Sequence, residues 1–140
     1  MKNLRLLTAL FAICLLASCA KDQMALDKLQ GTWTYKKASV FGITIDLDAI
    51  HYTGATLQFN KCKVADAHCN GVQTLPGVGA TNFAYNISKD GKTVNVINGT
   101  STTAYTINTL DDHNLVYSTS IDTSTGTTPI QITVQFSCVK

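Results

Sequence analysis

Apolar and polar residues alternate along most of the chain after residue 30, and the last segment shows this pattern best. Between residues 130 and 138 the apolar side chains occupy every second position, with Gln, Thr and Ser between them. Alternation with a period of two predicts antiparallel strands that have one face in the core and one in water. The apolar faces found in this way are Ile130, Ile132, Val134, Phe136 and Cys138; Leu115, Tyr117 and Ile121; Tyr105 and Ile107; Val94 and Val96; Phe83, Tyr85 and Ile87; Leu57 and Phe59; and Ile43, Ile45 and Leu47.

Together with residues 32–40, these segments predict about eight strands. Residues 88–91 and 110–115 carry the Gly, Asp and Asn residues that favour hairpin turns. Longer breaks at 48–54, 65–79 and 123–129 are predicted to be loops, where a binding rim would be built. An antiparallel up-and-down eight-stranded barrel removes exposed strand edges and is the favoured all-β fold. An open β-sandwich also buries one face of each strand and remains the alternative.

The N-terminal residues follow a different pattern, which is typical of an export signal. Lys2 and Arg5 precede an apolar run from Leu6 to Leu16, and small residues follow it. A membrane-spanning helix needs about 20 apolar residues, and this run is shorter. The export signal is therefore the preferred interpretation.

The end of this segment, Leu16-Ala17-Ser18-Cys19, resembles the lipobox of bacterial lipoproteins. The resemblance implies cleavage before Cys19 and a membrane anchor of acyl chains on its thiol. Cys14 is rejected as the lipidated residue because the large Ile13 precedes it. An outer-membrane lipoprotein of the cell envelope is expected, facing either the periplasm or the cell surface.

Three parts of the chain are therefore expected. Residues 1–18 form the signal peptide, residues 19–30 the lipidated Cys and a tether with a short helix, and residues 31–140 the β-barrel. Met24, Leu26 and Leu29 have the spacing of one or two helical turns and are the basis for the short helix.

The composition supports this interpretation and excludes one class of function. Twenty Thr residues, no Glu and a single Arg, Arg5, favour strands over long surface helices. Without residues 1–18 the chain has nine Lys and nine Asp, so its formal charge is zero. A nucleic-acid-binding protein needs an excess of cationic side chains on one face, so no nucleic-acid partner is expected.

Cys62 and Cys69 are separated by six residues, and in an exported protein this spacing favours a disulfide at a hairpin tip. A metal site formed by Cys62, His68 and Cys69 would lack a fourth ligand nearby in sequence, so no metal is expected. Cys138 lies on the apolar face of the last segment and is predicted to be a buried small side chain, although pairing with Cys62 or Cys69 stays open.

No motif in the sequence indicates catalysis or a cofactor. His51, His68 and His113 lie in or beside predicted loops, and none has the spacing of a helical zinc motif. Asp111 and Asp112 occupy a predicted tight turn, where Asp favours local backbone hydrogen bonds. We therefore expect a protein that is not an enzyme.

Leu29-Gln30-Gly31-Thr32-Trp33 resembles the Gly-x-Trp opening of lipocalins, in which the Trp closes the floor of a barrel. With residues 57–59 and 105–115, the chain from 26 to 140 is similar to the small lipocalin-like lipoproteins of Gram-negative bacteria. The resemblance implies a calycin-type barrel that holds a small apolar ligand or has a packed interior. Classical lipocalins place an Arg against that Trp, whereas residues 19–140 contain no Arg.

Eight aromatic residues are candidates for either a ligand pocket or a filled core, and filling is expected in so short a barrel. The leading hypothesis is a lipid-anchored, non-enzymatic protein that binds a small hydrophobic ligand. The alternative is an envelope interaction module with a filled core, which binds a protein or glycan through its loops. The eight residues are Trp33, Tyr35, Phe59, Phe83, Tyr85, Tyr105, Tyr117 and Phe136.

Overall fold

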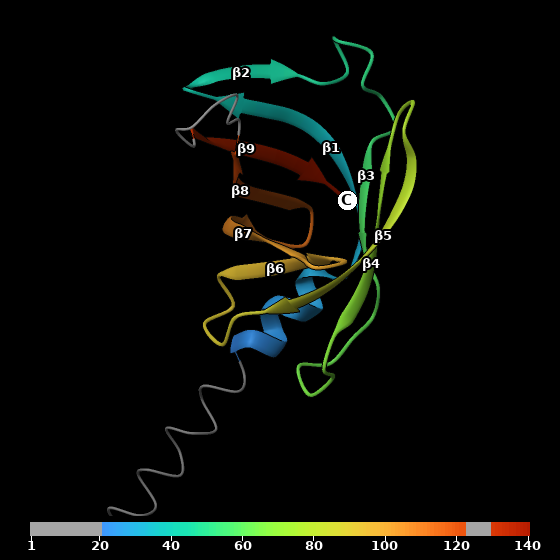
Figure 1. Cartoon of the computed structure of the whole chain (residues 1–140), viewed down its shortest axis with the longest axis vertical. Coiled ribbons are helices and arrows are strands. Elements are labelled where there is room, and N and C mark those ends of the chain that lie inside the picture. The colour runs from blue at the N-terminus through green and yellow to red at the C-terminus, as the bar shows by residue number, and fades with distance from the viewer. Residues whose placement is uncertain (1–20, 123–129) are drawn as a thin grey trace, which may run out of the picture.

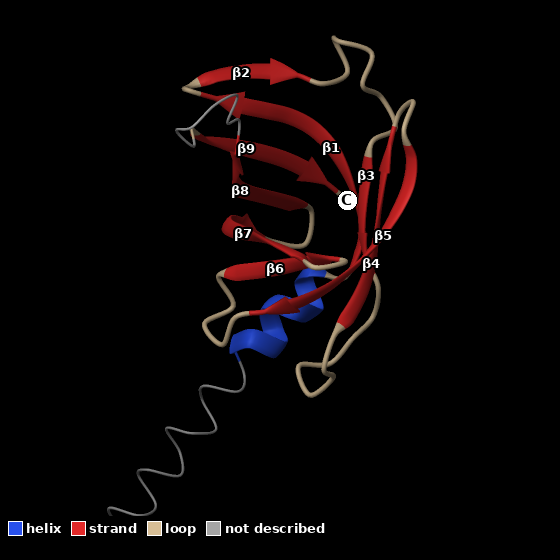
Figure 2. Cartoon of the chain, in the orientation of Figure 1, coloured by secondary structure: helices blue, strands red, loops and turns tan. Residues whose placement is uncertain are grey.

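The computed structural model describes residues 21–122 and 130–140, which form a closed antiparallel β-barrel with one helix at its end (Figures 1 and 2). The predicted signal peptide and Cys19 lie outside the described residues. The strands are β1 (Gly31–Val40), β2 (Ile43–Asp46), β3 (Thr56–Phe59), β4 (Cys69–Leu75), β5 (Gly79–Ile87), β6 (Thr93–Asn98), β7 (Ser101–Leu110), β8 (Asn114–Asp122) and β9 (Gln131–Val139).

Eight of these strands close the barrel, which confirms the predicted fold class. From β3 to β9 each strand pairs antiparallel with the next, and β1 pairs with β3 on one edge and with β9 on the other. The β1–β9 ladder runs from Thr34↔Val139 to Val40↔Val134. Closure leaves the eight strands without a continuous free edge, as the barrel hypothesis requires.

The identity of one barrel strand differs from the prediction. The segment from Ile43 to Leu47 was expected to bury one face, but β2 is exposed at all four positions and pairs with β1 alone. The missing strand is β4, which lies within the predicted loop 65–79. Its inner face carries Gly71 and Gln73, so it lacks the apolar alternation by which strands are found.

The end of the barrel next to the start of β1 is closed by a helix over residues 21–29, the N-terminal helix. Leu26 and Leu29 are fully buried against the barrel core. The indole nitrogen of Trp33 donates a 2.7 Å hydrogen bond to the carbonyl oxygen of Leu29, so the end of the helix is tied to the first strand. We call this the closed end.

Lys140 also crosses the closed end. Its Nζ lies 4.4 Å from the centre of a Trp33 ring and donates a 2.8 Å hydrogen bond to the carbonyl oxygen of Lys28. Gly31 makes room for this side chain, because a Cβ at Gly31 would lie 2.8 Å from Cε of Lys140. A lysine therefore provides the cation over the tryptophan in a chain whose described residues include no arginine.

The opposite end, which we call the open end, carries the β1–β2 hairpin and the β4–β5 turn (Figure 1). Phe41 and Gly42 both have positive φ angles, as a two-residue hairpin turn requires, and Phe41 is 80% exposed. Several other large apolar side chains are exposed on segments at this end. They are Ile43, Ile45, Ile50, Val78, Ile121 and Ile130, and with Phe41 they are called the apolar rim.

Candidate functional site

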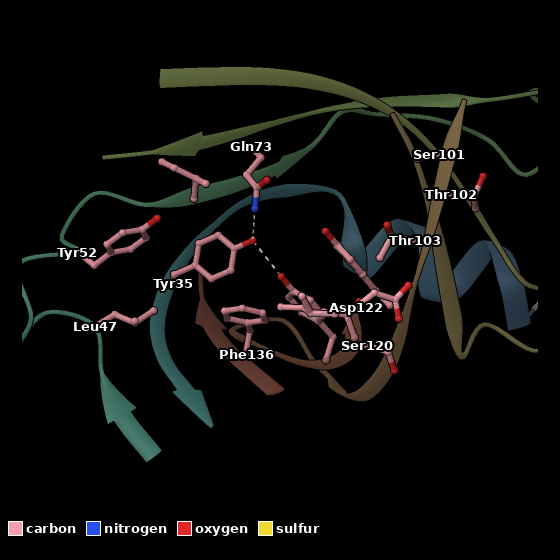
Figure 3. A pocket seen from close by; sticks show the side chains of 15 residues that line it. Tyr35, Leu47, Tyr52, Gln73, Ser101, Thr102, Thr103, Ser120, Asp122 and Phe136 are labelled. Carbon is pink, nitrogen blue, oxygen red and sulfur yellow. Dashed lines mark hydrogen bonds between the residues drawn. The ribbon is translucent and has the colours of Figure 1, made fainter. Parts of the chain in front are cut away.

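A pocket with a volume of about 600 Å³ lies inside the barrel toward the open end (Figure 3). Its lining comes from β1, β4, β7, β8 and β9 and from the loop between β2 and β3. The volume lies within the usual range of small-molecule sites. The lining residues are Tyr35, Leu47, Tyr52, Gln73, Leu75, Ser101, Thr102, Thr103, Tyr105, Tyr117, Thr119, Ser120, Ile121, Asp122 and Phe136.

The pocket continues between β7 and β8 because these two strands separate. Their paired residues end at Thr106↔Ser118, although β7 begins at Ser101 and β8 continues to Asp122. Backbone groups and side chains of both strands therefore face the pocket beyond that point, which explains why consecutive residues of each strand line it. The pocket walls are rich in Ser and Thr hydroxyls on this side.

The structure divides the eight predicted aromatic residues into two groups. Trp33, Phe59, Phe83 and Tyr85 are buried below the pocket, where Phe59 and Tyr85 pack edge to face with centroids 4.9 Å apart. The filled interior that was expected is present in this half alone. The other four, which line the pocket, are Tyr35, Tyr105, Tyr117 and Phe136.

These four aromatic residues are packed against one another. The rings of Tyr105 and Tyr117 are stacked with centroids 4.6 Å apart, and Phe136 lies 5.5 Å from Tyr35 in an edge-to-face arrangement. Tyr117 and Phe136 are also neighbours across the β8–β9 ladder. Four rings from four strands therefore form one aromatic surface inside the pocket.

The hydroxyl groups of two of these tyrosines form a hydrogen bond with each other. The Tyr35 and Tyr117 oxygens lie 3.0 Å apart, and Nε2 of Gln73 donates a 3.0 Å hydrogen bond to the Tyr35 oxygen (Figure 3). Burial raises the pKa of Tyr35 and of Tyr117 far above the usual value, because the phenolate would lose its hydration. Both phenols are therefore neutral hydrogen-bonding groups at physiological pH.

Thr119 is the one buried side chain in the described residues whose polar atom has no hydrogen-bond partner. The residue is 8% exposed and lies on β8, two positions beyond Tyr117 and therefore on the same face. Buried hydroxyls are normally paired, so an unpaired one in a pocket wall is unusual.

The pocket has little charge. Asp122 is the one ionisable carboxylate among the described lining residues, and no Lys, Arg or His lines the pocket. Lys36, which follows Tyr35, instead forms a 2.9 Å ion pair with Asp48 on the surface. Between Lys92 and Lys140 the sequence contains no Lys or Arg, so strands β6 to β9 supply no permanent cation.

The cysteines for which the sequence predicted a structural role do not line the pocket. Cys62 and Cys69 are joined by a disulfide with a Cα–Cα distance of 5.5 Å, as their spacing predicted. Gln30 donates a 2.8 Å hydrogen bond to the carbonyl oxygen of Cys62, which ties this loop to the end of the N-terminal helix. Cys138 is a free, buried thiol, and burial raises its pKa to about 12.

Asp111 makes the local backbone hydrogen bonds that are expected of an Asp in a tight turn. Its carboxylate accepts bonds of 2.8 Å from the backbone nitrogen of His113 and 2.7 Å from that of Asn114. These bonds explain why the pKa of Asp111 is lowered. Across the described parts of the chain, no three His, Cys, Asp or Glu side chains gather in a geometry suited to a metal ion.

Sequence reasoning did not find several residues of the pocket. Gln73 lies on the strand that the sequence did not predict, and Thr119 has the same residue type as many exposed positions. Tyr52 is a partial exception, because it belongs to the loop 48–54 that was proposed as a binding rim, and Gln73 falls within the predicted loop 65–79 of the same rim. Alternation around Tyr117 places Thr119 on the inner face, but nothing in the sequence indicates that its hydroxyl is unpaired.

Comparison of the chain with protein-family models, curated proteins and solved structures finds no match. Among residues 21–122 and 130–140, no helix combines the length and apolar character that crossing a membrane requires.

Proposed function

We propose that this protein is a lipid-anchored, non-enzymatic binding protein of the bacterial cell envelope, which holds a small hydrophobic molecule inside its barrel. The observation that carries the proposal is the pocket of about 600 Å³ with four packed aromatic rings, at the open end of a barrel that is plugged at the other end. Pockets of this size that combine aromatic side chains with hydrogen-bonding groups are typical small-molecule sites.

The polar groups of the pocket support binding rather than catalysis. Apart from the carboxylate of Asp122, they are alcohols, an amide and four phenols, and burial raises the pKa of Tyr35, Tyr105 and Tyr117. Such groups are weak acids and weak bases at neutral pH. Asp122 is exposed at the end of β8. The proposed role is therefore to hold a molecule without changing it.

The likeness to lipocalin-like lipoproteins also supports a ligand-binding barrel. Gly31 and Trp33 begin the first strand, and Lys140 supplies a cation over the indole ring, where classical lipocalins use an Arg. The anchor would lie beside the closed end, because Cys19 comes two positions before the first described helical residue, Lys21. The open end would then face away from the membrane that holds the protein.

Native mass spectrometry tests ligand binding. Residues 20–140 contain every residue of the described core and are produced in an oxidising compartment. We expect an additional mass that disappears on organic extraction. Thr103→Trp, an exposed position at the pocket wall, should abolish the additional mass, whereas Thr109→Trp, outside the pocket, should retain it. A bound mass that both variants keep would place the ligand elsewhere.

Metabolic labelling with a fatty-acid analogue tests the anchor. We expect label in the full-length protein, no label in Cys19→Ala and unchanged label in Cys14→Ala. Retention of label in Cys19→Ala would contradict lipidation at this residue, and loss in Cys14→Ala alone would assign it to the other cysteine.

The apolar rim favours a second candidate function, an interaction module. Phe41 is 80% exposed, and the neighbouring Ile43 and Ile45 are exposed on the same hairpin. Such contiguous exposed apolar groups often mark a surface for a partner protein. If the mass spectra show no ligand, and added fatty acids, long-chain alcohols, retinoids and haem-like ligands also fail to bind, this function replaces the first.

A further inference from the structure

The chemistry of the pocket wall restricts the ligand beyond its being hydrophobic. The hydroxyl of Thr119 is buried and has no partner within the protein, as far as the described residues show. Leaving such a group unpaired is unfavourable, whereas a ligand oxygen beside it would restore the missing hydrogen bond. Thr119 therefore indicates that the ligand carries a polar atom at this depth.

The tyrosine pair provides a second hydrogen-bonding group. Two phenol hydrogens are present in the pair, and the bond between the Tyr35 and Tyr117 oxygens uses one of them. Gln73 contacts the Tyr35 oxygen through its amide nitrogen, which is a donor only, so this contact does not take up the other hydrogen. One phenol hydrogen remains to be donated to an acceptor in the pocket.

The charge of the pocket decides which acceptor fits. A carboxylate would accept both hydrogen bonds, but its charge would be buried without a cation among the described lining residues. Asp122, in the same lining, would repel it. An alcohol, ester or amide oxygen accepts the same bonds without this cost of desolvation.

On the basis of the binding function proposed above, we propose that the pocket selects an uncharged amphiphile. Its hydrogen-bond-accepting oxygen would bind to Thr119 and the Tyr35–Tyr117 pair, and its aliphatic or aromatic body would pack on Tyr105 and Phe136. The ligand class is thus a long-chain alcohol, ester or amide and not a fatty-acid anion.

A series of ligands with one chain length tests this selection. Dodecane, dodecanol, dodecanamide, dodecanoate and dodecylamine are titrated against residues 20–140 by displacement of the uncharged dye Nile red. At neutral pH we expect dodecanol and dodecanamide to bind about tenfold or more tightly than dodecanoate, since a buried unpaired charge is strongly unfavourable. Protonating the acid at lower pH should bring its affinity close to that of the amide.

A matched pair of variants tests the contact with Thr119. Valine has the shape of threonine without the hydroxyl, so Thr119→Val should weaken dodecanol binding by about fivefold or more and leave dodecane binding unchanged. Its melting temperature should be equal to or above that of the wild type, which separates loss of the contact from loss of the fold. Thr109→Val, an exposed position on β7, should change neither value.

The outcomes separate this inference from the function on which it rests. If no member of the series binds, the proposed binding function fails as well. If dodecanoate or dodecylamine binds as tightly as dodecanol, or if Thr119→Val weakens dodecane as much as dodecanol, the barrel is a hydrophobic binder and the selection for an uncharged oxygen is wrong.

Discussion

At Gly71 the inner wall of the barrel has room for a hydrogen atom and nothing larger. A Cβ there would collide with the ring of Phe83 and would lie 2.6 Å from the backbone oxygen of Gln58. We expect Gly71→Ala to lower the unfolding free energy by about 3 kcal/mol, because the β3 backbone is paired with β4 and cannot move away from the added methyl group. Urea unfolding measures the change, with Asn70→Ala as the exposed neighbouring control. Equal stabilities of the two variants would contradict this packing.

Phe41 is a residue whose backbone conformation is unfavourable for its side chain. It has a φ of 51° at the hairpin tip, where Asn or Gly is preferred, and it is 80% exposed. Phe41→Asn should therefore raise the unfolding free energy by about 1 kcal/mol. Phe41→Leu, which keeps the strain, is the control. A lower stability of the Asn variant would show that the Phe ring is packed in solution.

The pocket shows which residues of a binding site can be predicted from the alternation of apolar and polar positions. Alternation identifies Tyr35, Tyr105 and Tyr117 as inner-face residues, because each is apolar enough to contribute to the period. It cannot distinguish a ring that fills the core from a ring that borders a cavity. Thr119 and Gln73 acquire their importance from the neighbours that the fold brings to them across the barrel.

Among the elements, the N-terminal helix is part of the core and not an external tether. Leu26 is fully buried and Met24, on the same helix, is 60% exposed. We expect Leu26→Ala to lower the unfolding free energy by about 3 kcal/mol through the cavity it leaves, and Met24→Ala to change it by less than about 0.5 kcal/mol. Chemical denaturation of both variants provides the measurement. Similar values would mean that the helix does not pack on the barrel.

The strands β2 and β4 show why the number of barrel strands could be predicted while the identity of one could not. Ile43 and Ile45 alternate like buried residues, but β2 continues a hairpin beyond the barrel and remains exposed. The barrel strand β4 is not apparent in the sequence because two of its inward-facing residues are not apolar. Gly71 has no side chain, which leaves room for Phe83, and Gln73 forms a hydrogen bond with Tyr35. Alternation reports side-chain character, and here close packing at Gly71 and a hydrogen bond at Gln73 both override it.

For the molecule as a whole, the buried tyrosines predict a loss of stability in alkaline solution. Burial raises the pKa of Tyr35, Tyr105 and Tyr117, and that of Tyr85 to about 12. The unfolded chain releases these protons near pH 10, before the native protein does, so the native state binds more protons above that pH. The unfolding free energy should be constant between about pH 7 and 9 and fall above about pH 10.

Urea unfolding at a series of pH values, with tyrosinate absorbance recorded in parallel, measures this dependence. Each tyrosine that stays protonated in the native state but is ionised in the unfolded chain lowers the unfolding free energy by up to about 1.4 kcal/mol for each pH unit. Tyr105→Phe is the most informative variant, because it removes one titrating group whose hydroxyl makes no hydrogen bond within the described residues. Its slope above pH 10 should be shallower than that of the wild type, and an unchanged slope would show that Tyr105 ionises freely in the native state.

The ladder between β1 and β9 also determines when the protein can fold. Because it joins the first and last strands, the barrel cannot close until the final strand is present, and contacts between distant parts of a chain make folding slow. If the protein is exported as proposed above, this delay would keep the chain unfolded during transport. On the export proposed above, the order of the strands would postpone closure of the barrel until transport is complete.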